Sequence, residues 1–418
     1  MFKIKPEYLR FFTIVMVLEI PLILASMWMT GDFREPRFNI WPVTEWLINY
    51  QGGFVRRGLV GELLLGWSDP VIGILPNLYL VTLISYIAYI AIFFAIYFLA
   101  KIENYRVLLI AILIQGGIYH MGISVDFFTR KENLFLILFG LLCLVYINAS
   151  KQHGIYKRYL LIAFTFLALV FGPVMILIHE AYFFMSMPMT AMLFWITSKE
   201  NPNVVFIRIG FWSYLLACTM LFIVCSVNHG DVALAQAVWD SLPWVDRMKL
   251  SPAAPYSQFA AISSVGWEIG QHLSTIYGVF ITGGVYWWIF FMIGNGLSLA
   301  YLATQIYPTA VLAQPSRIFG LLLTALVISA GMFVLAADWG RWIAFISNQL
   351  ILFMFTLNCS VLATMPEQSK VLLFLLRKIK RVHFRGLFWV LLLYGLLFQM
   401  PECCVQYPHL FVFASIFQ

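Results

Sequence analysis

Apolar residues occur along this chain in repeated runs that are separated by short polar segments. A run of about 20 apolar residues is long enough to cross a bilayer as a helix, because a helix satisfies its own backbone hydrogen bonds. The pattern predicts an all-α polytopic transmembrane protein with about 11 transmembrane helices. The expected spans are 11–29, 78–100, 107–124, 134–149, 159–178, a run from just after Glu180 to Lys199, 205–225, 277–302, 318–336, 343–364 and 386–400. The run 59–67 is too short to span and predicts a re-entrant or interfacial helix.

Composition supports one integral membrane domain over residues 1–418. Of the 418 residues, 62% are hydrophobic and only 11% are charged, whereas a soluble domain is about 45–50% apolar and about 25% charged. The net charge of +7 lies mostly in short loops between spans, so it gives no reason to expect a nucleic-acid partner. Two connecting segments stand out: a long outer loop at 227–275, and a basic amphipathic segment at 366–385 that is expected on the cytoplasmic leaflet.

Charge distribution predicts the orientation. With the N-terminus in the cytoplasm, 17 of the 26 Lys and Arg residues and 4 of the 19 acidic residues lie inside. Outside lie 9 basic and 14 acidic residues, and Glu19 falls within a span, so the net charge is +13 inside and −5 outside. This asymmetry follows the positive-inside rule.

Polar clusters gather on the predicted outer face, several of them at span ends. The most conspicuous lies in 49–62, where Arg56 and Arg57 are framed by glycines that would let backbone or ligand approach closely. Arginine's planar fork suits phosphate oxygens, and carboxylates or histidine accept protons. The predicted phosphate-binding residues are Arg56, Arg57, Arg130, Lys131 and Arg341. The predicted catalytic residues are Glu180, His179 and Asp338, with Glu62, Asp126 and Glu132 in support.

Each cluster also has a plainer structural explanation. The arginine pair could contact Glu45 or Glu62 at the membrane surface, and 130–132 could be an ordinary hairpin between spans. Asp338 and Arg341 are spaced for an ion pair within one helical turn. The tryptophans beside them, and those of the long loop, could form an aromatic belt at the membrane interface.

A polytopic chain of this size, with outer clusters GGFVRRG, TRKE, HE and DWGR, resembles the bacterial Wzy-type O-antigen and capsular polysaccharide polymerases. These belong to the wider group of GT-C-like membrane glycosyltransferases. The resemblance covers the architecture and the clusters; the acidic pair that many of these enzymes carry after the first span has only a loose counterpart in Asp32 and Glu35.

The resemblance implies an inner-membrane enzyme that joins polyprenyl-diphosphate-linked glycan units on the periplasmic face. Arg56, Arg57, Arg130 and Arg341 would hold phosphate, and Glu180, His179 or Asp338 would be the base. The implied partners are the lipid-linked oligosaccharide, membrane lipids and a chain-length regulator. No DxD-like metal motif occurs, so a metal-independent reaction without a cofactor is expected.

Three other functions remain open from the sequence. A transferase that adds one sugar from a polyprenyl-monophosphate donor would need the same residue types. A transporter predicts inverted repeats, broken helices and ionisable residues at mid-membrane, of which Glu19 is the clear example. A scaffold role would leave the outer cationic cluster unexplained.

Overall fold

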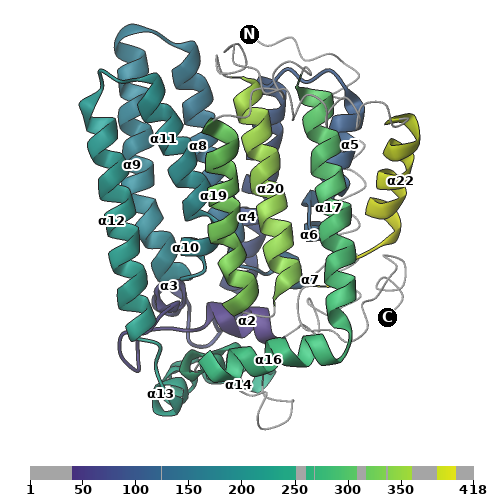
Figure 1. Ribbon diagram of the computed structural model, residues 1–418. Coiled ribbons are helices and arrows are strands. Elements are labelled where there is room, and N and C mark those ends of the chain that lie inside the picture. Colours follow the sequence, from purple (N-terminus) through teal and green to yellow (C-terminus); the bar gives the residue numbers. More distant parts are fainter. Residues whose placement is uncertain are drawn as a thin grey trace.

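A computed structural model describes residues 40–123, 125–250, 260–267, 269–307, 317–335, 338–359 and 384–401 of the chain (Figure 1). Every regular element in these ranges is a helix. In the first half they are α2 (Ile40–Trp46), α3 (Gly58–Trp67), α4 (Leu75–Leu99), α5 (Tyr105–Leu113), α6 (Ile118–Ile123), α7 (Val125–Phe128), α8 (Asn133–Lys151), α9 (Gly154–Ile178), α10 (Tyr182–Met185) and α11 (Met187–Glu200). In the second half they are α12 (Val205–Val227), α13 (Val232–Ser241), α14 (Trp244–Leu250), α15 (Ala260–Ser263), the 3-10 helix η2 (Ser264–Gly266), α16 (Ile269–Ile281), α17 (Gly284–Ile306), α19 (Arg317–Leu335), α20 (Trp339–Asn358) and α22 (Phe384–Leu397).

Six helices within the described ranges are long and apolar enough to cross a membrane: α4, α8, α9, α12, α17 and α20. Large apolar side chains such as Leu80, Trp212 and Trp389 are exposed on the bundle's sides, where a bilayer would cover them. The described part of the chain is thus all-helical and has the long apolar helices of a multi-pass membrane protein, as predicted. The predicted count of about 11 spans is not confirmed.

One reason for the lower count is a break in the span predicted at 107–124. Helix α5 ends at Leu113. A short non-helical segment that contains Gln115 and Gly116 follows, and the next helix is α6. Gly116 has φ +71, which a glycine adopts without strain. The backbone oxygens freed there accept hydrogen bonds from other helices, Gln115 O from Asn295 and Gly116 O from Asn348, at 3.0 and 2.8 Å.

The run predicted after Glu180 is likewise divided, into α10 and α11, and neither part reaches span length. The span predicted at 11–29 and the basic segment 366–385 lie outside the described residues, except for the last two positions of that segment. The other predicted spans correspond to described helices whose ends differ by a few residues, apart from 277–302, which α16 and α17 share across a turn at Gly283.

The long helices run roughly parallel, and short helices gather at one end of the bundle (Figure 1). We call this the polar end; α2, α3, α13, α14 and α16 lie there, at the bottom of the view. The predicted long loop 227–275 is largely folded, as α13, α14, α15, η2 and the start of α16, with 251–259 and 268 outside the described ranges. Asp246 of α14 fastens it to the bundle, because its carboxylate accepts hydrogen bonds from the backbone N–H groups of Ile74 and Leu75 at the start of α4.

Candidate functional site

Charged side chains from five places in the sequence meet at the polar end, and each comes from the end of a helix or from a short connection. We call this set the ion cluster. Helix ends carry backbone groups without helical partners, so polar side chains collect there. The ion cluster consists of Glu45 on α2, Arg56 and Arg57 before α3, Arg130, Lys131 and Glu132 before α8, His179 and Glu180 between α9 and α10, and Asp338 and Arg341 at the start of α20.

Glu45 lies at the centre of the ion cluster, and its side chain is only 1% exposed. Its Oε1 lies 3.1 Å from Arg57 Nη1 and 2.9 Å from His179 Nε2. Its Oε2 lies 2.9 Å from Arg130 Nη1 and 3.6 Å from Arg341 Nη1. Burial alone would raise the pKa of Glu45, but His179, Arg341 and Arg130 hold it well below its ordinary value. Glu45 therefore carries a fixed negative charge that draws four basic groups together.

Glu132 and Arg341 form a second buried pair beside Glu45. Glu132 is fully buried, and its Oε1 lies 3.1 Å from Arg341 Nη1. Arg341 also contacts Asp338 Oδ2 at 2.6 Å, the ion pair expected from their spacing of three residues. The Arg341 guanidinium lies 4.6 Å from the ring centre of Trp342, within the range of a cation–π contact. Arg341 is thus enclosed by protein groups, so its role in phosphate binding remains a prediction with no accessible surface to favour it.

Lys131 contacts the backbone of two other segments, and its predicted phosphate-binding role remains a prediction. Its Nζ donates to two backbone oxygens, Glu45 O at 3.0 Å and Arg57 O at 3.3 Å. Burial lowers the pKa of Lys131 to about 8, because the charged ammonium loses its water. Lys131 therefore holds together the two segments that carry Glu45 and Arg57. Arg57 needs such support, since its φ of 68° is uncommon for a residue with a side chain.

Arg56, Arg57 and Glu180 form the accessible rim of the ion cluster. Arg57 Nε lies 2.9 Å from both oxygens of Glu180, and its Nη2 lies 2.6 Å from Oε1. Arg56 Nη1 lies 3.5 Å from the same oxygen, and its Nη2 donates to the backbone oxygens of Ser264 and Val265. The arginines are 14% exposed and Glu180 is 12% exposed, whereas Glu45, Arg130, Glu132, His179 and Arg341 are at most 3% exposed. Of these eight residues, the two rim arginines and Glu180 are therefore the ones that keep some exposed surface.

The glycines around the arginine pair serve close contacts within the chain. A Cβ on Gly61 would collide with the backbone oxygen of Ile48, and one on Gly58 would collide with the ring of Tyr50. These two glycines let α3 pack directly on the segment after α2. The packing brings Arg57 within reach of Glu45.

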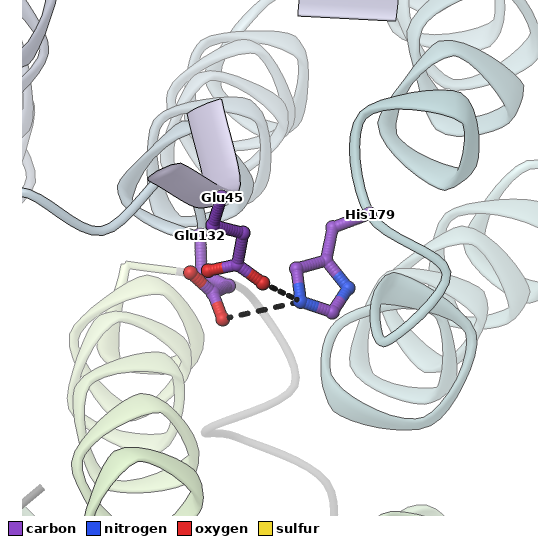
Figure 2. Close-up of side chains that lie close together, drawn as sticks. All are labelled: Glu45, Glu132 and His179. Atoms are coloured by element: carbon purple, nitrogen blue, oxygen red, sulfur yellow. Dashed lines mark ion pairs between the residues drawn. The ribbon is translucent and has the colours of Figure 1, made fainter. Parts of the chain in front are cut away.

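His179 lies among three carboxylates. Figure 2 shows two of them, those of Glu45 and Glu132. His179 Nε2 faces Glu45 Oε1 at 2.9 Å and Glu132 Oε1 at 3.7 Å, and its Nδ1 lies 3.4 Å from Glu180 Oε2. Nδ1 also accepts a hydrogen bond from the backbone N–H of Ala181 at 3.1 Å. The imidazole thus lies between the partly exposed carboxylate of Glu180 and the buried carboxylates of Glu45 and Glu132.

The donor atoms of Glu45, Glu132 and His179 lie within 4.8 Å of one another, as those of a metal site would. Guanidinium groups already contact both carboxylates, Arg57 at Glu45 and Arg341 at Glu132. A divalent ion here would have to displace them. A metal-bound histidine also normally donates from its second ring nitrogen, whereas Nδ1 of His179 accepts from a backbone N–H. These residues fit a guanidinium network better than a metal ion.

Of the predicted supporting residues, Glu62 lies outside the ion cluster, and the side chain of Asp126 is not described. Glu62 accepts hydrogen bonds from Tyr50 N at 2.9 Å and Gln51 Nε2 at 2.8 Å, so it shapes the loop before α3. Asp126 belongs to α7, and its side chain lies outside the described part. The central residue Glu45 was expected only in the plainer explanation of the arginine pair. That explanation holds in part, because Arg57 does contact Glu45.

An apolar cavity of about 190 Å³ begins one helical turn from the rim. Phe183, three residues after Glu180, lines it together with Met187 and Trp195 of α11, Phe211 of α12 and Ile328 of α19. The cavity is thus bounded by α11, α12 and α19, of which α12 is long and apolar enough to cross a membrane.

Comparison with known proteins gives no relative from which a function could be transferred. No family model, curated protein or solved structure matches the chain.

Proposed function

We propose that this chain is a membrane glycosyltransferase that joins polyprenyl-diphosphate-linked glycan units during surface polysaccharide assembly. The observation that carries the proposal is the rim of Arg56, Arg57 and Glu180 at the end of a membrane-spanning bundle. A lipid diphosphate has its charge at the membrane surface and its apolar chain in the bilayer. The accessible arginines and the apolar cavity one turn away offer complementary groups for both parts.

In the proposed reaction, the hydroxyl oxygen of an acceptor glycan attacks the anomeric carbon of the donor sugar. The bond from that carbon to the diphosphate oxygen breaks, and polyprenyl diphosphate leaves with the electron pair. Arg56 and Arg57 stabilise the charge that develops on this leaving group. The acceptor proton passes to Glu180 or His179, which lie next to the arginines. Asp338, bound to Arg341, is the other accessible carboxylate and the remaining base candidate.

The buried part of the ion cluster has a supporting role in this proposal. Glu45 and Lys131 hold Arg57 in place. Glu45 and Glu132 contact Nε2 of His179, the ring nitrogen that faces away from the rim. Groups that are already fixed in position lose little conformational freedom when the transition state forms. Their charges therefore stabilise the transition state without first having to reorient. The enzyme would work without a metal ion, with the polar end facing the periplasm of a bacterial inner membrane and the N-terminus in the cytoplasm.

The transporter alternative has one feature in its favour, the interruption between α5 and α6. Broken helices in transporters leave backbone groups that line a substrate path. Here Asn295 and Asn348 bind the freed oxygens of Gln115 and Gly116, so protein groups fill the gap. This makes a glycosyl-transfer role the better supported proposal.

The test is a transfer assay with purified protein in proteoliposomes. Supplied with polyprenyl-diphosphate-linked oligosaccharide, the protein should produce a ladder of products that differ by one repeat unit. The ladder should persist in EDTA, because the proposed reaction uses no metal. A single added sugar from a polyprenyl-monophosphate donor would instead favour the one-sugar transferase. Uptake of solute without any glycosyl transfer would refute the proposal.

A further inference from the structure

We propose that the Glu180 carboxylate occupies the position of a ligand phosphate on Arg57, and that the diphosphate of the donor displaces this carboxylate when the donor binds. This inference rests on the proposed function and adds to it the way in which the site is opened. The Glu180 carboxylate takes the Nε and Nη2 side of the Arg57 guanidinium, with three contacts between 2.6 and 2.9 Å. A phosphate uses the same two parallel donors. Glu180 and a phosphate therefore compete for one binding edge.

The other edge of Arg57 would remain occupied during the exchange. Its Nη1 contacts Glu45 Oε1 at 3.1 Å, and Lys131 holds its backbone oxygen. Glu45 is buried and has three further basic neighbours, so displacing it would leave several charges without a partner. Within the described ranges, the ion pairs of Glu180 are with the rim arginines and His179. Glu180 is the carboxylate of the ion cluster that can leave Arg57 at the lowest cost.

Charge balance favours a diphosphate over a monophosphate. The ion cluster holds five basic side chains, Arg56, Arg57, Arg130, Lys131 and Arg341, and four carboxylates, Glu45, Glu132, Glu180 and Asp338. Among these nine side chains, His179 not counted, the excess is one positive charge. Removing Glu180 from the arginines leaves two positive charges uncompensated there. A diphosphate linked at both ends carries two negative charges, whereas a monophosphate linked at both ends carries one.

The exchange would also change Glu180 as a proton acceptor. Burial alone would raise the pKa of Glu180, and Arg57, followed by His179 and Arg56, holds it well below its ordinary value. A phosphate on the arginines removes that influence, so the pKa rises. The displaced carboxylate then accepts a proton more readily and starts 3.4 Å from His179 Nδ1. The base would become active only when a donor is bound, which protects the site from premature reaction.

The test is titration calorimetry of the full-length protein in detergent, with inorganic diphosphate and with inorganic phosphate. Glu180→Gln should bind diphosphate about tenfold or more tightly than the wild type, because the charged competitor is gone. Asp240→Asn is the matched control, since it removes one negative charge from α13 at the same end of the protein, outside the ion cluster. Its affinity should stay within about twofold of the wild type. Equal or weaker diphosphate binding by Glu180→Gln would overturn the exchange.

Two further measurements keep this test decisive. If Glu180→Gln does not fold, infrared difference spectra of the wild type should show one carboxylate band leaving its ion-paired position on diphosphate addition; an unchanged band would overturn the proposal. A short-chain polyprenyl diphosphate should bind more tightly than inorganic diphosphate if the ligand is a lipid, and equally if it is a free anion. These results do not depend on glycosyl transfer. The exchange can therefore fail while the proposed reaction stands, and the reverse is also possible.

Discussion

Replacement of Glu45 by glutamine is expected to lower the free energy of unfolding by about 3–5 kcal/mol, the range found when one partner of a buried ion pair is removed. Glutamine has nearly the same shape but no charge. Arg130 would lose its carboxylate at 2.9 Å while remaining 2% exposed, and Arg57 and His179 would lose the same partner. Equilibrium unfolding in mixed micelles of mild detergent and SDS measures the effect.

The control for this variant is Glu62→Gln, which makes the same chemical change in a partly exposed side chain. Glu62 accepts two hydrogen bonds in its own loop, so the expected loss is about 1 kcal/mol. If both variants unfolded at the same SDS concentration, Glu45 would not be the centre of the charge network. A Glu45→Gln protein as stable as the wild type would contradict the account in the same way.

Loss of the Arg57 guanidinium is expected to have the largest effect on activity. Arg57→Gly should reduce the rate of glycosyl transfer by about 10²–10³-fold or more, the range found when a preorganised donor to a developing anion is removed. Glycine is the suitable replacement because φ at this position is 68°, where alanine would add strain. Arg57→Lys keeps the charge without the fork and should recover only part of the rate.

The matched control is Arg247→Ala. Arg247 lies in α14, also at the polar end, and pairs with Asp240 at 3.5 Å outside the ion cluster. Its side chain is partly exposed, so its loss should leave transfer within about twofold of the wild type. Size-exclusion profiles and thermal unfolding establish that each variant is folded. Full transfer activity in a folded Arg57→Gly protein would remove the arginine from the proposed mechanism.

The convergence of the clusters could be predicted from sequence because hydropathy locates span ends well. Once spans are placed, alternation puts Arg57, Arg130, His179 and Arg341 at the same end of the bundle. The structure brings these four side chains around a common partner. Their catalytic and phosphate-binding roles remain predictions.

Burial depth within the ion cluster could not be predicted. In the sequence, Arg57 and Arg341 are both arginines in polar clusters on the predicted outer face. In the structure, Arg57 lies on the rim, whereas Arg341 is enclosed. Glu45 was no more conspicuous than other acids of the first outer loop, and its central place depends on how α2 packs. Lys131 donates to backbone oxygens, which every residue has, so the sequence gives no indication of these partners.

The predicted span at 107–124 is interrupted where local backbone geometry breaks an apolar run. Hydropathy is insensitive to the break between α5 and α6, because the surrounding residues are apolar. The pair Gly116–Gly117 was the available signal, since glycine permits the positive φ found at Gly116. The amides that bind the freed oxygens, Asn295 and Asn348, come from distant helices and could not be assigned in advance.

The most direct test of the central claim, that the accessible arginines hold a lipid diphosphate, compares two ligands with the same apolar chain. Purified protein is titrated with polyprenyl diphosphate and with the corresponding polyprenol, and bound lipid is counted by native mass spectrometry. The account predicts one saturable site for the diphosphate, about 100-fold weaker binding of the alcohol, and loss of this preference in Arg57→Gly. Equal binding of both lipids to the wild type would contradict it.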